Sequence, residues 1–112
     1  MNVRQVTNTI VSAINRGSFT DFKTCIGPGA NAFEPGRRFR GRSGVLRWAK
    51  AEIFDVGGRL KVRYAVRRGG REVRYGRFQT SSFGFKVKYI FQSSKGKLIR
   101  WDLKYWRSKT CS

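Results

Sequence analysis

The side chains able to transfer protons are few in this sequence. Histidine, the most common general base in enzymes, is absent, so acid–base chemistry would depend on carboxylates whose pKa values are shifted. The chain of 112 residues has six of them. They are Asp21, Glu34, Glu52, Asp55, Glu72 and Asp102.

The positions of these acids favour structural roles. Asp21 follows Ser18 by three residues, as in the first turn of a capped helix. Asp55 stands just before the turn signal Gly57-Gly58. Asp102 alternates with basic neighbours along a predicted strand, which favours an ion pair. Only Glu52, near the end of a predicted helix, is placed to point into a pocket.

The two cysteines, Cys25 and Cys111, offer little further chemistry. They lie far apart in the chain and have no histidine partner for metal binding or thiol activation. Whether they form a disulfide stays open, with free thiols the default. Since no nucleotide-binding or zinc motif is present either, we expect no enzyme activity, no cofactor and no metal.

Charge is the most unusual property of the chain. Its 25 Lys and Arg residues against six acids give a net charge of +19. Residues 1–36 hold three basic and two acidic side chains, so nearly all of the excess lies in residues 37–112. Solubility alone needs a net charge of only about 2–8. The excess therefore indicates a polyanionic partner.

The elements that would position these residues change in type along the chain. Apolar residues at helical spacing predict a helix over 2–16, followed by a short helix capped by Ser18. Residues 1–26 are thus a helical part. Residues 27–44, rich in Gly, Pro and Arg, are expected to form a loop with short strand pieces around Phe33 and Phe39. Residues 45–107 would hold a third helix, capped by Ser43, and then an antiparallel sheet of four or more strands in one domain.

Alternation of apolar and basic residues in these strands would collect cations on one sheet face. The members of this set are Lys61, Arg63, Arg67, Arg74, Lys86, Lys88, Arg100 and Lys104. Like charges opposite one another cost up to about 1 kcal/mol a pair. A bound anion would offset that cost, and phosphate backbone is the commonest candidate.

A second basic group lies in the Gly/Pro-rich segment. It consists of Arg37, Arg38, Arg40 and Arg42. Guanidinium groups bind phosphate through two parallel hydrogen bonds, and Phe39 lies among them. A mixture of basic and aromatic residues is typical of a flexible segment that clamps nucleic acid. The alternative interpretation is a solvated loop. Among the large aromatic residues, Trp101 is expected in the core, whereas Trp106 could equally stack on a base.

The order of parts resembles the nuclear transport factor 2-like superfamily, including its SnoaL-like members. The resemblance rests on the segments "INRGSFTDFKTCI", "SGVLRWAKAEI", "GGRLKVRYAV", "REVRYGRF", "FGFKVKYIF" and "SKGKLIRWDLKYW". The resemblance covers nearly the whole chain. It lies in the order of helices and strands more than in signature motifs. It implies a cone-like, cystatin-like α+β fold with a curved sheet wrapped round helices. It also implies a pocket at the open end and pairing of two copies through the sheet.

The predicted function is therefore weakly sequence-specific nucleic-acid binding, with RNA or single strands favoured and a viral capsid or genome-packaging role as one subtype. The first alternative is a transport-factor-type adaptor that binds an acidic protein. The second is a small-molecule enzyme or binder that uses the cone pocket. We expect a homodimer or larger homo-oligomer, no membrane partner, and a cytoplasmic or virion location with nuclear entry open.

Overall fold

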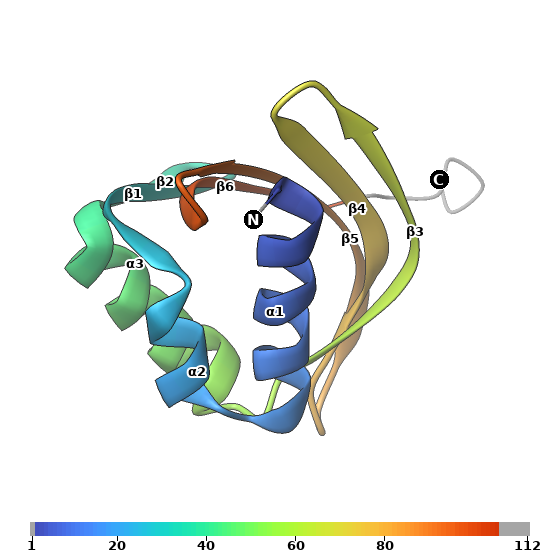
Figure 1. The fold of residues 1–112 in the computed structure, drawn as a ribbon. Helices are drawn as coiled ribbons and strands as arrows, with labels where there is room; N and C mark the ends of the chain where they lie inside the picture. The colour runs from blue at the N-terminus through green and yellow to red at the C-terminus, as the bar shows by residue number, and fades with distance from the viewer. Residues whose placement is uncertain (1, 106–112) are drawn as a thin grey trace.

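The computed structural model describes residues 2–105, which form helices packed against a six-stranded sheet. In chain order the elements are α1 (Val3–Arg16), α2 (Phe19–Thr24), β1 (Ile26–Glu34), β2 (Arg37–Arg40), α3 (Gly41–Ala49), the π-helical turn η1 (Lys50–Phe54), β3 (Arg59–Arg68), β4 (Arg71–Gln79), β5 (Gly84–Ser94) and β6 (Lys97–Tyr105). The sheet curves round the helices (Figure 1), so the predicted α+β fold is confirmed. Among residues 2–105 no helix has the length and apolar content needed to cross a bilayer.

Helix α1 forms because its apolar residues recur on one side and both of its ends are capped. Ile10 and Ile14 on that side are fully buried. At the start, the Asn2 and Gln5 side chains each accept a hydrogen bond from the other residue's backbone N–H. Gly17 ends the helix in the left-handed conformation that glycine adopts without strain. The helix predicted over residues 2–16 is confirmed.

The strand pieces expected around Phe33 and Phe39 are confirmed, but the loop predicted over the rest of residues 27–44 is wrong, because the segment forms β1, β2 and the start of α3. Its Gly- and Pro-containing part is an irregularity inside a strand, where the pairing of β1 with β6 shifts register between Ile26 and Asn31. A side chain at Gly27 would approach the Leu98 carbonyl oxygen to 3.0 Å. The glycine therefore permits close strand contact, which composition alone does not reveal.

Helix α3 begins at Gly41, so the predicted cap at Ser43 is also wrong. The backbone N–H of Gly41 donates instead to the Asn31 side-chain oxygen, 3.1 Å away on β1. This bond links the start of α3 to the sheet. The helix continues into η1, where buried Ile53 keeps the segment packed against the core.

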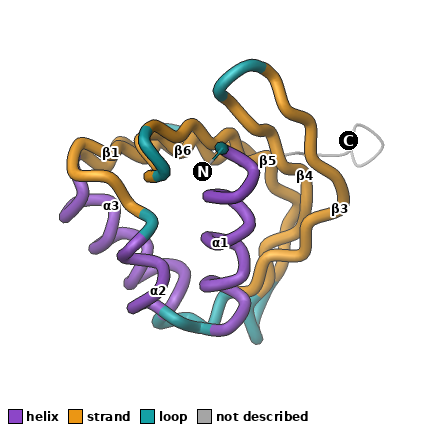
Figure 2. The backbone as a smooth tube through the Cα atoms, in the orientation of Figure 1, coloured by secondary structure: helices purple, strands orange, loops and turns teal. Residues whose placement is uncertain are grey.

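The strand order is β2-β1-β6-β5-β4-β3. The four long strands β3 to β6 form successive antiparallel hairpins, as predicted (Figure 2). The sheet as a whole is mixed, because β1 pairs with β6 in parallel. The prediction of a wholly antiparallel sheet is therefore wrong, because β1, which lies mostly in the segment predicted as a loop, adds a parallel pair.

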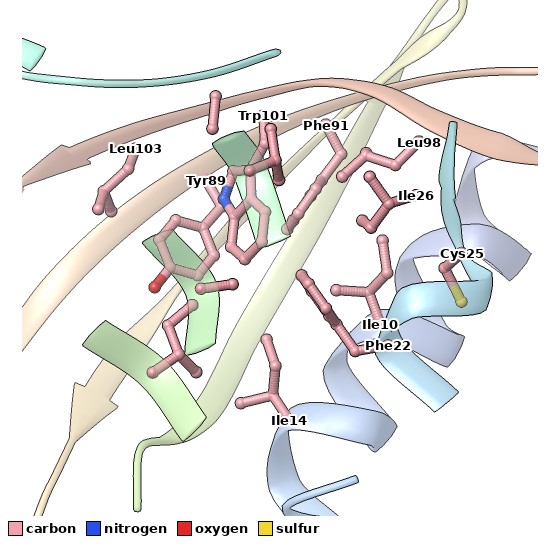
Figure 3. Close-up of a cluster of buried hydrophobic side chains, with 14 of the residues drawn as sticks. Ile10, Ile14, Phe22, Cys25, Ile26, Tyr89, Phe91, Leu98, Trp101 and Leu103 are labelled. Carbon is pink, nitrogen blue, oxygen red and sulfur yellow. The ribbon is translucent and has the colours of Figure 1, made fainter. Parts of the chain in front are cut away.

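The core lies between the helices and the concave side of the sheet (Figure 3). Trp101 on β6 is fully buried, as predicted, and packs against Phe22 of α2 and Phe91 of β5. Trp48 of α3 meets the same indole edge to face at 5.1 Å. These aromatic contacts fix the helices on the sheet.

Candidate functional site

The strand register divides the sheet into two faces. Residues directly opposite one another on paired strands share a face. The inner face, which packs on the helices, holds the row Phe78–Phe85 and the row Arg74–Tyr89–Leu103. The outer face points away from the helices and holds the residues that alternate with the inner-face residues along each strand.

A pocket opens on the inner face between α3, η1 and the sheet, with a volume of about 210 Å³. We call it the cone pocket. Its wall is mainly apolar and aromatic, with two carboxylates. The lining residues that matter for its chemistry are Glu34, Trp48, Glu52, Tyr89 and Tyr105.

Glu34 is the carboxylate best placed for chemistry. It ends β1, and its side chain is only 7% exposed. Burial raises the pKa of this carboxyl above its ordinary range. Arg37, whose Nη1 lies 2.7 Å from Glu34 Oε1, lowers the pKa, and the Glu52 carboxylate raises it again. The net shift is upward, toward the range that general acid–base catalysis uses.

Two hydrogen-bond donors line the same pocket. The Trp48 indole N–H contributes to lowering the pKa of Glu34, yet the pair lacks the geometry of a full hydrogen bond and Nε1 is otherwise buried without a partner. Tyr89 is 3% exposed, and burial raises the pKa of its hydroxyl well above the ordinary value. Within residues 2–105 that hydroxyl makes no hydrogen bond. Both donors are neutral and available to a ligand.

The pocket rim carries charge that is already paired. Arg37 binds Glu52 through both terminal nitrogens, at 3.2 and 2.6 Å, while it also contacts Glu34. Burial raises the pKa of the Tyr105 hydroxyl, which lies at the same rim. Glu52 therefore does reach the pocket, as predicted, but its side chain is 42% exposed and stands at the mouth.

The structure gives no support to a metal site, because residues 2–105 contain no cluster of three or more potential ligands. Cys25 is buried, and burial raises the pKa of its thiol. Cys111 and Trp106 lie outside the described residues. The open question of a disulfide and the suggested stacking role of Trp106 thus remain predictions.

The fold keeps three arginines of the predicted clamp around one pocket, Arg37, Arg38 and Arg40, and separates Arg42 from them. Arg37 is held at the rim of the cone pocket. Arg38 lies over the Phe33 ring on the outer face, and Arg40 is opposite Asn31 on the edge strand. Arg42 donates hydrogen bonds to the Lys23 and Ile26 carbonyl oxygens and so ties α3 to the end of α2. A flexible clamp made of all four is therefore wrong.

Some, but not all, of the cations predicted to share one sheet face do so. The register places on the outer face Lys61, Lys86, Lys88, Arg100 and Lys104. Arg74 is the main error, since it lies on the inner face with its side chain 9% exposed, bound to Glu72 and to Asn8. A register shift between Val62 and Tyr64 reverses the alternation in β3. Arg67 consequently lies opposite inner-face Glu72 and does not share the face of Lys61.

Four outer-face cations of β3 and β4 were missed from the sequence: Arg59, Arg68, Arg71 and Arg77. Period-two alternation anchored on Phe78 would have found two of them, because Arg71 and Arg77 have the opposite parity to that buried ring. Glu34 was missed as a pocket residue because it lay in the presumed loop. Its signal would have been an acid at the end of an apolar strand.

No protein-family model matches the chain, and no curated protein matches it. Solved structures do match it closely in shape. An NTF2-like protein of unknown function from Cytophaga hutchinsonii has a TM-score of 0.83 at 10% identity, over 95% of this chain and 91% of the other. The chain has the nuclear transport factor 2-like fold. The resemblance inferred from the order of helices and strands is confirmed at that level.

Two further structures with this fold carry enzyme names. A putative ketosteroid isomerase from Kribbella flavida has a TM-score of 0.83 at 13% identity, covering 95% of this chain and 78% of the other. A putative polyketide cyclase from Sinorhizobium meliloti has a TM-score of 0.80 at 16% identity, covering 88% and 93%. These neighbours overturn the prediction that the protein is not an enzyme, which rested on the absence of histidine. They lend no support to nucleic-acid binding or to a capsid role.

Proposed function

We propose that the cone pocket binds a small carbonyl compound and that the Glu34 carboxyl transfers a proton to and from it. The observation that carries this proposal is a carboxyl that is 7% exposed, has its pKa raised by burial, and lines an apolar pocket. A buried carboxyl with a raised pKa in a pocket is the kind of group that acid–base catalysis uses. At about 210 Å³ the pocket is smaller than typical ligand sites of roughly 300–1,000 Å³, which favours a compact ligand.

The chemistry divides between one base and two donors. The ionised Glu34 carboxylate removes a proton from the carbon beside the carbonyl group, which leaves negative charge on the carbonyl oxygen. The Tyr89 hydroxyl and the Trp48 indole N–H donate hydrogen bonds to that oxygen. Tyr89 stays protonated because its pKa is raised. The Glu34 carboxylic acid then returns the proton to the same carbon or to another.

The names of two fold neighbours support this reaction class, although similarity of fold alone does not establish function. One is a putative ketosteroid isomerase and the other a putative polyketide cyclase. Arg37 and Glu52 act on the reaction indirectly, by changing the pKa of Glu34. Arg37 stabilises its ionised form and Glu52 opposes that effect, so together they set its proton affinity.

The test uses cyclohex-3-en-1-one, whose conversion to the conjugated ketone is followed by ultraviolet absorbance. Deuterium exchange beside the carbonyl, followed by NMR in D₂O, reports the first proton transfer separately. We expect wild-type protein to accelerate both and Glu34→Gln to lose roughly a hundredfold or more of the rate. Asp21→Asn is the control, since Asp21 is an exposed acid bound to Arg16 on the helices. Wild-type rates in Glu34→Gln would overturn the proposal.

A further inference from the structure

A basic pocket adjoins the cone pocket. It has a volume of about 410 Å³ and is lined by residues of β2, α3 and η1. We call it the arginine pocket, because its lining includes Arg37, Arg38, Arg40 and Arg47. Trp48 and Glu52 line both this pocket and the cone pocket. A single ligand with two different ends can therefore reach both.

The lining of the arginine pocket carries a net positive charge. Among residues 2–105 it holds four guanidinium groups and one carboxylate, that of Glu52. Arg37 binds Glu52 through both terminal nitrogens, at 3.2 and 2.6 Å, and so neutralises it. The other three arginines, Arg38, Arg40 and Arg47, are exposed and come from two different elements, β2 and α3. The pocket is therefore suited to an acidic group.

Stacked side chains connect the two pockets. The Phe39 ring stacks on Trp48 with centroids 5.1 Å apart, and the Arg37 guanidinium lies 4.8 Å from the Phe39 centroid. These contacts hold Trp48 in place, and its buried indole N–H is one of the donors available in the cone pocket. A ligand whose carbonyl oxygen is bound at that indole thus lies beside the arginine pocket.

We propose that the arginine pocket binds a carboxylate or phosphate group of the same compound whose carbonyl group enters the cone pocket. The substrate is then an anionic carbonyl compound, such as an oxo acid. This inference rests on the proposed function of the cone pocket. Guanidinium groups bind both kinds of acidic group through parallel hydrogen bonds. Charged residues on an edge strand also prevent it from pairing with another sheet, but that role would not involve Arg47, which belongs to α3.

The experiment compares ligands that differ in charge. 4-Oxopentanoate and its methyl ester share one carbonyl group, and 3-oxobutylphosphonate has a phosphonate in place of the carboxylate. Deuterium exchange beside the carbonyl in D₂O gives kcat/KM for each. With wild-type protein we expect an advantage of about tenfold for at least one anion over the ester. Arg47→Gln should reduce this ratio toward one. Arg68→Gln removes an exposed arginine from β3, at the other end of the strand order, and should keep the wild-type ratio.

Binding measured without turnover separates this inference from the proposed function. In nitrogen-15 NMR spectra the preferred anion should shift both the Arg47 Nε–H signal and the Trp48 indole N–H signal. Such shifts without any exchange would support the arginine pocket and contradict proton transfer by Glu34. Equal exchange of the ester and both anions would overturn the present inference and leave the proposed function standing. So would equal losses in Arg47→Gln and Arg68→Gln, or an anion that shifts the Arg47 signal and leaves that of Trp48 unchanged.

Discussion

The two faces of the sheet hold their charges in opposite ways. On the inner face and at its rim, cations are matched by carboxylates, as in the pairs Arg74–Glu72 and Arg37–Glu34. On the outer face Lys61 and Arg77 stand opposite each other on β3 and β4, and neither forms a salt bridge within residues 2–105. Matched charge inside the cone stabilises the fold and tunes a reactive group. The outward cations Lys61 and Arg77 contribute little to folding.

Arg74 and Arg77 illustrate the difference on a single strand. Arg74 Nε lies 2.6 Å from a Glu72 oxygen, and Glu72 is fully buried. Arg77, three residues later, points to the opposite face and is exposed. A buried carboxylate that loses its cation is costly, whereas an exposed cation without a partner contributes little to folding.

Substituting these two arginines should produce the largest contrast. We expect Arg74→Met to lower the free energy of unfolding by about 3 kcal/mol, the lower end of the range for a broken buried pair, because Arg4 still contacts Glu72. We expect Arg77→Met to change it by less than about 0.5 kcal/mol. Urea denaturation followed by tryptophan fluorescence measures both.

A double variant sharpens this comparison. Glu72→Met/Arg74→Met removes both charges, and we expect it to recover much of the stability lost in Arg74→Met, since apolar residues often replace a buried pair without loss. Equal effects of Arg74→Met and Arg77→Met would contradict the division between matched and unmatched charge.

A smaller effect is expected from Glu34→Gln, and its sign depends on pH. Because the pKa of Glu34 is raised in the folded protein, the protonated carboxyl favours folding at low pH. That contribution is fully present below the ordinary value of 4.5 and is lost as pH rises through the folded-state pKa. The stability of Glu34→Gln relative to wild type should therefore increase from pH 4 to pH 7. Thermal denaturation across this range measures the difference, and a decrease would contradict the assignment.

Regular alternation made part of the fold predictable. Helix α1 and the hairpins from β3 to β6 follow periods of 3.6 and two, interrupted by glycine turns. Beyond the pieces expected around Phe33 and Phe39, the full length of β1 and β2 escaped prediction, because the Gly and Pro residues of β1 lie at a register shift supported by a strand distant in sequence. Tertiary pairing there overrides local propensity.

The candidate site was less predictable than the fold. The shift in β3 that separates Lys61 from Arg67 lies opposite Gly76 of β4, where a side chain would clash with the Lys61 carbonyl oxygen, so a glycine inside a strand was its one signal in the sequence. Arg74 was misplaced because basic residues were assumed to face solvent, whereas Glu72 and Asn8 bind it inside. Glu34 gained its environment only through the fold, which brings the end of β1 beside α3.

The central claim is that the fold buries Glu34 as a proton-transfer group, and a site-resolved titration tests it most directly. Carbon-13 NMR of the side-chain carboxyls should give Glu34 a pKa above its ordinary value of 4.5, because of burial. Asp21, held by Arg16 on the exposed helical side, should titrate below its ordinary value of 3.8. In Glu52→Gln the pKa of Glu34 should fall, since a neighbouring negative charge is removed. A Glu34 pKa at or below 4.5 in the wild-type protein would contradict the account.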